Sequence, residues 1–189
     1  MADEVTFPAF DRSMFVPLIE ANVIKTLTGY GTAGTGDDWT RIDKSTVFDL
    51  AFNPNTETKS YIDNKNDINE LTSYTPSMEQ EIVIDGNNPL YALMYEFAMA
   101  FPVGSDAEIP TMLVMPSVRT KDVMDAFVWR KALVTLNNLN TVDKKISFTL
   151  NLNGDMERGT ATVTDGKFTY VPATSGVSEA SAFSAKSSK

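Results

Sequence analysis

Two strand-like runs separated by a long polar connection constrain the fold more than any other part of the chain. Residues 45–52 and residues 78–84 both alternate between apolar side chains and polar or small ones. The apolar positions are Phe48, Leu50 and Phe52 in the first run and Met78, Ile82 and Ile84 in the second. A period of two is typical of a strand with one buried face. Both runs are therefore predicted to be strands that cover a core.

The connection between these runs contains a further strand candidate and then a loop. Residues 56–62 are rich in β-formers and are expected to pair back onto the first strand as a hairpin partner. Residues 63–76 are mostly polar and hold too few apolar side chains for a core of their own. So long a loop is unusual in a compact domain, where connections are roughly 4–6 residues. The loop is therefore predicted to contact another protein surface.

One helix is predicted at about residues 88–101. Asn88 can cap it, Pro89 suits the first helical position, and Pro102 ends it. Apolar residues recur at helical spacing at Leu90, Leu93, Met94, Phe97, Ala98 and Phe101. Because Glu96 is the only charged residue between Leu90 and Phe101, the helix is expected to be buried by a sheet or by a neighbouring subunit.

The rest of the chain is predicted to be mainly extended. Residues 109–115 form a strand candidate bounded by prolines, and residues 121–138 form a longer one whose alternation shifts phase, which indicates a bulge or a break. Residues 145–152 alternate cleanly and are expected to continue as a β-meander through 156–164 and 167–171. The predicted fold class is mainly β (α+β), a sandwich-like or barrel-like domain with one buried helix and a long inter-strand loop.

The length of 189 residues fits one domain, predicted to span residues 1–172. Residues 1–13 show no period and are expected to form an N-terminal arm, while residues 15–27 fit neither a strand nor a helix clearly. Residues 173–189 are rich in Ala, Ser and Lys and are predicted to form a flexible C-terminal tail.

Composition argues against several functions. The chain has no cysteine and no histidine, which removes thiolate chemistry, the commonest general base and the commonest transition-metal ligand, so no enzyme is expected. A net charge of −9 opposes adhesion to phosphate backbones. No run of 18 apolar residues and no charged-then-apolar leader is present, so neither membrane insertion nor a signal segment is expected.

Two motif matches fail on inspection. Residues 29–34 fit GxGxxG, but two carboxylates and a strand pattern follow where a phosphate-binding helix should open. The acidic loop offers Asp63, Asn66, Asp67, Asn69 and Glu70 as oxygen ligands, but Lys65 and Ile68 occupy the third and sixth positions of an EF-hand register. No cofactor and no dedicated metal site are predicted.

Several segments together resemble the major tail protein, or tail tube protein, of long-tailed non-contractile bacteriophages. The resemblance covers roughly residues 10–170. It rests on Trp39-Thr40-Arg41-Ile42, Tyr61-Ile62-Asp63, Tyr74-Thr75-Pro76-Ser77, the central helix and Phe127-Val128-Trp129-Arg130-Lys131-Ala132.

The resemblance implies a structural virion protein, made in the host cytoplasm and located in the phage tail. Six copies would join their sheets into a ring, and stacked rings would form the tube through which DNA passes without specific binding. Tape measure and tail-terminator proteins would be its other partners.

Two groups of residues are predicted to serve assembly. The loop is expected to reach the next ring through Asp63, Lys65, Asp67, Ile68, Leu71 and Tyr74. Glu79 and Glu81 lie on the face of their strand opposite the apolar one and are expected to line an electronegative channel.

Two other functions remain open. One is a monomeric ligand-binding or cell-surface β-sandwich, which would need a concave aromatic pocket built around Trp39 and Trp129. The other is a hydrolase that uses a carboxylate pair such as Glu79 with Glu81.

Overall fold

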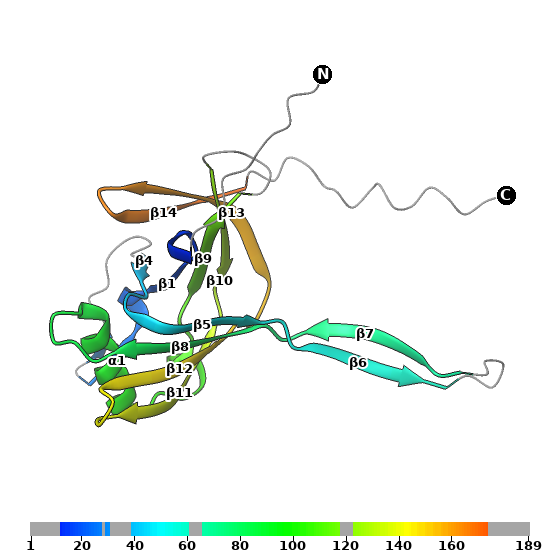
Figure 1. The fold of residues 1–189 in the computed structure, drawn as a ribbon, viewed down its shortest axis with the longest axis horizontal. Coiled ribbons are helices and arrows are strands. Elements are labelled where there is room, and N and C mark those ends of the chain that lie inside the picture. The colour runs from blue at the N-terminus through cyan, green and yellow to red at the C-terminus, as the bar shows by residue number, and fades with distance from the viewer. Residues whose placement is uncertain (1–11, 28, 31–38, 61–65, 118–122, 174–189) are drawn as a thin grey trace, which may run out of the picture.

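The computed structural model describes residues 12–27, 29–30, 39–60, 66–117 and 123–173, and the statements below concern these residues. Within them the chain is mostly β, with one α-helix, a closed six-stranded barrel, a four-stranded sheet and two short two-stranded sheets (Figure 1). The predicted fold class is confirmed. Every strand pairing is antiparallel.

The barrel encloses the smaller of two hydrophobic clusters. In order around the barrel its strands are β1 (Val16–Glu20), β4 (Trp39–Arg41), β14 (Lys167–Pro172), β13 (Met156–Thr164), β10 (Met124–Trp129) and β9 (Thr111–Pro116). Alternate residues of these strands fill the interior: Val16, Leu18, Trp39, Met112, Val114, Ala126, Val128, Ala161 and Tyr170. Period-two alternation thus fills the barrel interior with side chains.

The barrel closes at a narrow seam, because β4 and β14 share only the pair Trp39 and Phe168. Arg130, two residues beyond Val128, stacks at this point: its guanidinium carbon lies 6.0 Å from the Trp39 ring centre and 5.7 Å from that of Tyr170. It also forms an ion pair with Glu157 on β13, at 3.3 Å. Cation–π contacts of this kind contribute about 0.5–1 kcal/mol each at exposed sites. Arg130 therefore stabilises the contact between β4 and β14, which share a single residue pair.

The four-stranded sheet covers the outside of the barrel and contributes to the larger core. Its order is β11 (Leu133–Asn140), β12 (Lys145–Asn151), β8 (Ser77–Val83) and β5 (Ser45–Ala51). The inner face is apolar along β8 and β12, with Met78, Ile82, Ile146, Phe148 and Leu150 buried. Gln80 lies on the same face, and neither polar atom of its buried side chain has a hydrogen-bond partner in the described part of the chain.

Helix α1 (Pro89–Ala100) starts and ends where the sequence predicts. The Asn88 side-chain oxygen accepts a hydrogen bond of 3.0 Å from the Leu90 amide. Leu90, Met94 and Phe97 are buried in the larger core, so the apolar side of the helix is covered within its own chain. Phe101 ends the helix in the left-handed conformation, with φ of 48°.

The structure decides the course of three stretches of the chain and contradicts the prediction in one of them. Residues 121–138 are broken into β10 and β11, which lie in different sheets, as the phase shift indicates. The predicted meander from residue 145 to 171 is wrong at its first turn, because β13 pairs with β10 and β14 and not with β12. Residues 15–27, which fit no single element, contain β1, a 3-10 turn η2 (Ala21–Val23) and β2 (Lys25–Thr26).

Short elements complete the described fold: η1 (Arg12–Met14), β3 (Gly29–Tyr30) beside β2, and η3 (Gly104–Ala107) before β9. The expected N-terminal arm falls largely outside the described residues. So do most of the GxGxxG match and the predicted tail from residue 174 onward.

Candidate assembly surfaces

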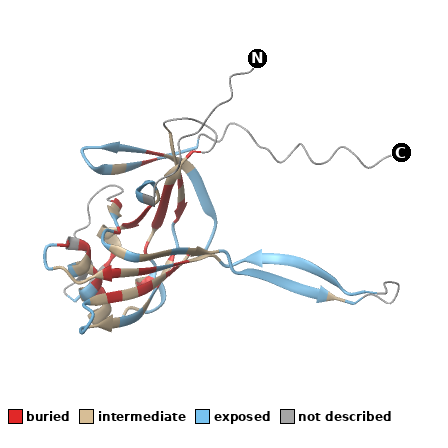
Figure 2. Ribbon diagram, in the orientation of Figure 1, coloured by how far each residue is buried: buried red, intermediate tan, exposed pale blue. Residues whose placement is uncertain are grey.

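A two-stranded arm extends from the body of the protein, formed by β6 (Pro54–Lys59) and β7 (Ile68–Tyr74) (Figure 1). The prediction of a loop without secondary structure is wrong for residues 68–74, and residues 54–59 pair with them rather than with β5. The arm prolongs the β5 and β8 pair past Asn53 and Thr75. All its side chains are exposed except the half-buried Lys59 (Figure 2).

The two faces of the arm differ in chemistry. The Glu70 face carries Asn55, Glu57, Lys59, Ile68, Glu70 and Ser73, and here Lys59 forms an ion pair with Glu70. The Leu71 face carries Pro54, Thr56, Thr58, Asn69, Leu71 and Tyr74. A β-bulge at Thr72 produces this arrangement, because Leu71 lies opposite Thr56 while Ser73 lies opposite Asn55. In a regular strand without a bulge, Leu71 and Tyr74, three residues apart, would lie on opposite faces.

The predicted loop residues are only partly brought together. Asp63 and Lys65 lie outside the described residues, and Asp67 accepts a hydrogen bond from Ser60. The side chains of Ile68, Leu71 and Tyr74 are 41%, 51% and 56% exposed. The oxygens of Asn69 and Glu70 project to opposite faces, so they do not converge as calcium ligands must.

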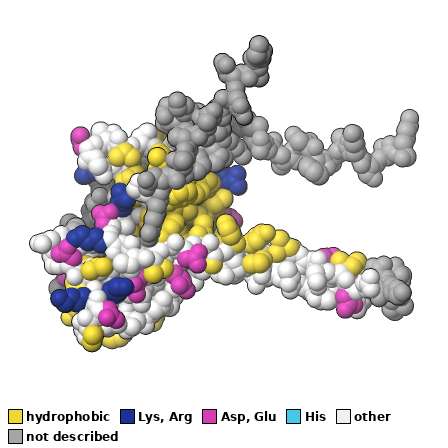
Figure 3. Space-filling view, viewed as in Figure 1, with side chains coloured by type: hydrophobic (Ala, Val, Ile, Leu, Met, Phe, Trp, Pro, Cys, Tyr) yellow, Lys and Arg dark blue, Asp and Glu magenta, His cyan; other side chains and the backbone are white. Residues whose placement is uncertain are grey.

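An apolar groove lies in the corner between the arm and the barrel, and the sequence analysis did not predict it. Its volume is about 620 Å³. Phe52 and Tyr74 form its wall on the arm side, while Met115, Phe127 and Met156 form its wall on the barrel side. Figure 3 shows hydrophobic side chains gathered where the arm leaves the body. Trp129 also borders the groove, whereas Trp39 is buried in the barrel interior, so the two tryptophans do not form one pocket.

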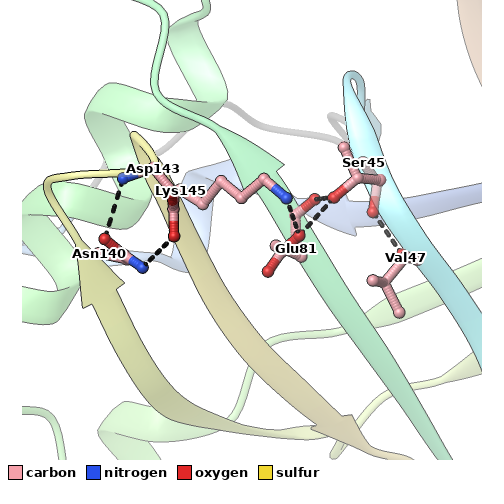
Figure 4. A network of polar contacts seen from close by, with 7 residues as sticks. Ser45, Val47, Glu81, Asn140, Asp143 and Lys145 are labelled. Atoms are coloured by element: carbon pink, nitrogen blue, oxygen red, sulfur yellow. Dashed lines mark hydrogen bonds and ion pairs between the residues drawn. The ribbon is translucent and has the colours of Figure 1, made fainter.

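The outward face of the four-stranded sheet is polar and includes the predicted acidic pair. Glu79 is exposed and lies opposite Asp49 on β5 and Thr149 on β12. Glu81 accepts hydrogen bonds of 2.6 Å from the Lys145 ammonium and from the Thr46 hydroxyl (Figure 4). These two hydrogen bonds, that of Lys145 first, hold the pKa of Glu81 below its ordinary value. A general acid needs the opposite shift, so Glu81 is suited to a permanently ionised surface.

The edges of this sheet are open. Within the described ranges β5 pairs only with β8, and β11 pairs with β12 apart from one bridge between Leu133 and Glu108. Unpaired strand edges present free backbone donors and acceptors that can extend a sheet into another chain.

Two other kinds of site are absent from the described ranges. No group of three or more acidic side chains there converges on a point that could hold a metal ion. No helix within the same ranges has the length and apolar character needed to cross a bilayer.

Comparison with known proteins gives matches in structure only. No protein-family model matches the chain, and no curated protein matches it in sequence. The sheath/tube terminator of the extracellular contractile injection system PVC, in its extended state, is similar with a TM-score of 0.48 and 7% identity, covering 82% of this chain and 99% of that one.

Two further similar structures come from the anti-feeding prophage. The tube terminating cap has a TM-score of 0.46 and 14% identity, covering 84% of this chain and 95% of that chain. The baseplate structure contains a chain with a TM-score of 0.43 and 13% identity, and the match covers 82% of this chain and 97% of that chain. Identities and TM-scores this low assign the chain to no family. None of the three structures is described as belonging to a non-contractile phage tail, the kind of tail suggested by the sequence resemblance.

Proposed function

We propose that this chain is a structural protein of a phage-like tail that assembles with copies of itself into stacked hexameric rings. The rings form a tube for DNA delivery, located in the virion and built after synthesis in the host cytoplasm. The other proposed partners are a tape measure protein inside the tube and a tail-terminator protein at the end of the tube.

The observation that carries this proposal is the arm. An isolated two-stranded hairpin is only marginally stable in water, and this one buries no side chain against its own body. The ion pair of Lys59 with Glu70 is exposed, and such pairs contribute about 0–1 kcal/mol. Contacts within its own subunit thus give the arm little stabilising free energy. Such an arm is suited to becoming ordered against a neighbouring subunit, which here is a copy in the next ring.

The open edges of the four-stranded sheet support the ring. If β5 of one copy pairs with β11 of the next, the contact is head-to-tail and can close on itself. Closure removes edges that would otherwise promote aggregation. The polar face with Glu79 and Glu81 would then line one side of the ring continuously.

Self-assembly is tested directly on the purified chain. Light scattering coupled to size exclusion should show oligomers whose mass rises with protein concentration, and negative-stain electron microscopy should show rings or tubes. A strict monomer of 20.8 kDa at high concentration would overturn the proposal.

The electronegative channel yields a prediction at Glu79. Glu79→Lys should leave the fold intact, because Glu79 is exposed, and should make assembled tubes retain DNA by electrostatic attraction to phosphate. Salt-dependent co-sedimentation of DNA with the tubes measures this. Glu79→Gln is the matched control and should retain none. Lysine at Glu81 is a poorer probe, since it would face Lys145. If Glu79→Lys tubes release DNA as readily as the wild type, this face does not line the channel.

The groove favours a second candidate, the monomeric ligand-binding module, because it is concave and has Phe52, Tyr74, Phe127 and Trp129 around it. The two functions differ in oligomeric state. A protein that stays monomeric and binds small apolar probes in the groove, with the arm unaffected, would favour the ligand-binding function over the tail function.

A further inference from the structure

The groove is bordered on one side by the arm itself. Phe52 and Tyr74, at the root of the arm, are 61% and 56% exposed although they line an apolar cavity. Leu71, 51% exposed, follows Tyr74 outward on the same face of the arm because of the bulge at Thr72. Three large side chains, each more than half exposed, therefore form one apolar strip that leads out of the groove. Contiguous exposed apolar surface of this kind marks an interaction site.

The strand ladder is interrupted at the junction between arm and body. Asn53 adopts φ of 44°, a conformation that L-residues seldom occupy, and Pro54 and Pro76 both lack a backbone N–H. The β5 and β8 ladder ends at the pair Ala51 and Ser77, and the ladder of the arm begins at the pair Pro54 and Tyr74. No residue pair lies between them. In that gap the Thr75 amide donates to the Asn53 carbonyl at 3.2 Å, and the Asn53 side-chain amide donates to the Thr75 carbonyl at 3.1 Å and to the Ser77 hydroxyl at 3.0 Å. Each of these hydrogen bonds involves Asn53, which thus joins the β5 and β8 ladder to the β6 and β7 ladder.

We propose that the arm is a strap with two positions. In the open position, seen here, it projects from the body; in the closed position it bends at Asn53 and Thr75 and lays Leu71 and Tyr74 over Met115, Phe127 and Met156. Leu71 lies four residues from Thr75, a reach of roughly 13 Å at about 3.3 Å per residue. Closure buries the apolar strip and the groove together.

The strap of the same chain is favoured over a second copy as the occupant of the groove. The arm is tethered at the edge of the groove, and a short tether gives a local concentration in the millimolar range. A free copy at ordinary concentrations cannot match this. The consequence for the proposed tail function is that free subunits shield their contact surface and expose it only on joining a tube. The closing motion itself does not depend on that function.

The absence of native cysteine makes the strap directly testable. Leu71→Cys with Met156→Cys should form an intrachain disulfide on mild oxidation of the monomer, seen as a faster band on a non-reducing gel. Ile68→Cys with Met156→Cys is the matched control, because Ile68 lies on the Glu70 face, and it should remain reduced. A second pair, Leu71→Cys with Asn153→Cys, leaves Met156 in place at the wall of the groove and uses an exposed position, so it keeps the test valid if the Met156 variant misfolds.

Spin labels at the same pairs measure the populations of the two positions. The Leu71 pair should give a short and a long distance, whereas the Ile68 pair should lack the short one. A single long distance for both pairs, interchain crosslinks alone, or equal crosslinking of the two pairs would overturn the strap.

The oxidised Leu71 pair should also lose assembly, and reduction should restore it. If the reduced protein never assembles, the tail function fails, while the disulfide and distance results still decide whether the strap exists.

Discussion

Removing the arm is expected to abolish tubes while leaving the domain folded. In the variant, an Asn-Gly turn replaces residues 55–73 and joins Pro54 to Tyr74, so β5 and β8 keep their full pairing. The arm contributes no fully buried side chain, so its removal takes no contact out of either hydrophobic core. Thermal unfolding should therefore match the wild type, whereas electron microscopy should show no long tubes.

Symmetric removal is needed because both strands of the arm belong to one hairpin. Shortening residues 65–73 alone would delete most of β7 and leave β6 unpaired. Persistence of full-length tubes in the arm-deleted protein would show that stacking does not use the arm. A loss of cooperative unfolding would show that the arm supports the fold.

Gly159→Ala is expected to destabilise the barrel strongly. An added Cβ would lie 2.2 Å from the Val171 carbonyl oxygen and 2.6 Å from the Tyr170 ring. β13 and β14 would have to separate, or the ring would have to leave the barrel interior and give up its hydrogen bond to the Arg158 carbonyl and its contact with Arg130. Overpacking of this kind costs about 3 kcal/mol. At about 2–4 °C per kcal/mol, the melting temperature should fall by roughly 6–12 °C.

Gly86→Ala is the matched control, since its added Cβ would meet nothing within 4 Å. It should melt at the wild-type temperature or slightly above it, because alanine reduces the entropy of the unfolded chain. Differential scanning calorimetry of the two variants separates close packing from a general effect of removing glycine. Equal melting temperatures would mean that the β13 and β14 pair can relax around a side chain at residue 159.

Where one face of an element is buried, the sequence predicted the element correctly. The inward residues of β12 alternate with polar ones, and α1 has its cap, its apolar stripe and its terminating proline within a single stretch. The hairpin of β13 and β14 follows from Asp165 and Gly166, both of which have positive φ. These signals are local, so tertiary contacts were not needed to interpret them.

The arm was missed because neither of its faces is buried. Alternation reports a difference between a buried and an exposed side, and residues 54–59 and 68–74 have no such difference. Leu71 and Tyr74, three residues apart, also share a face only because of the bulge at Thr72. The acidic pair was placed correctly on the outward face of β8, since its strand alternates. Its role in the channel remains a prediction.

The sequence by itself determined the strands that alternate between a buried and an exposed face, the position of the helix and the apolar side of each such strand. Only the tertiary structure decided which strands pair, and with that the barrel, the groove and the hinge at Asn53. Residues 153–155 could turn β12 back on itself, yet they carry the chain into the barrel, where Met156 pairs with Trp129. Apolar burial is non-directional: it requires that a face be covered but does not specify by which neighbour. Partner choice therefore depends on how residues far apart in the sequence, such as Leu50, Met115 and Phe127, pack against one core in the folded chain.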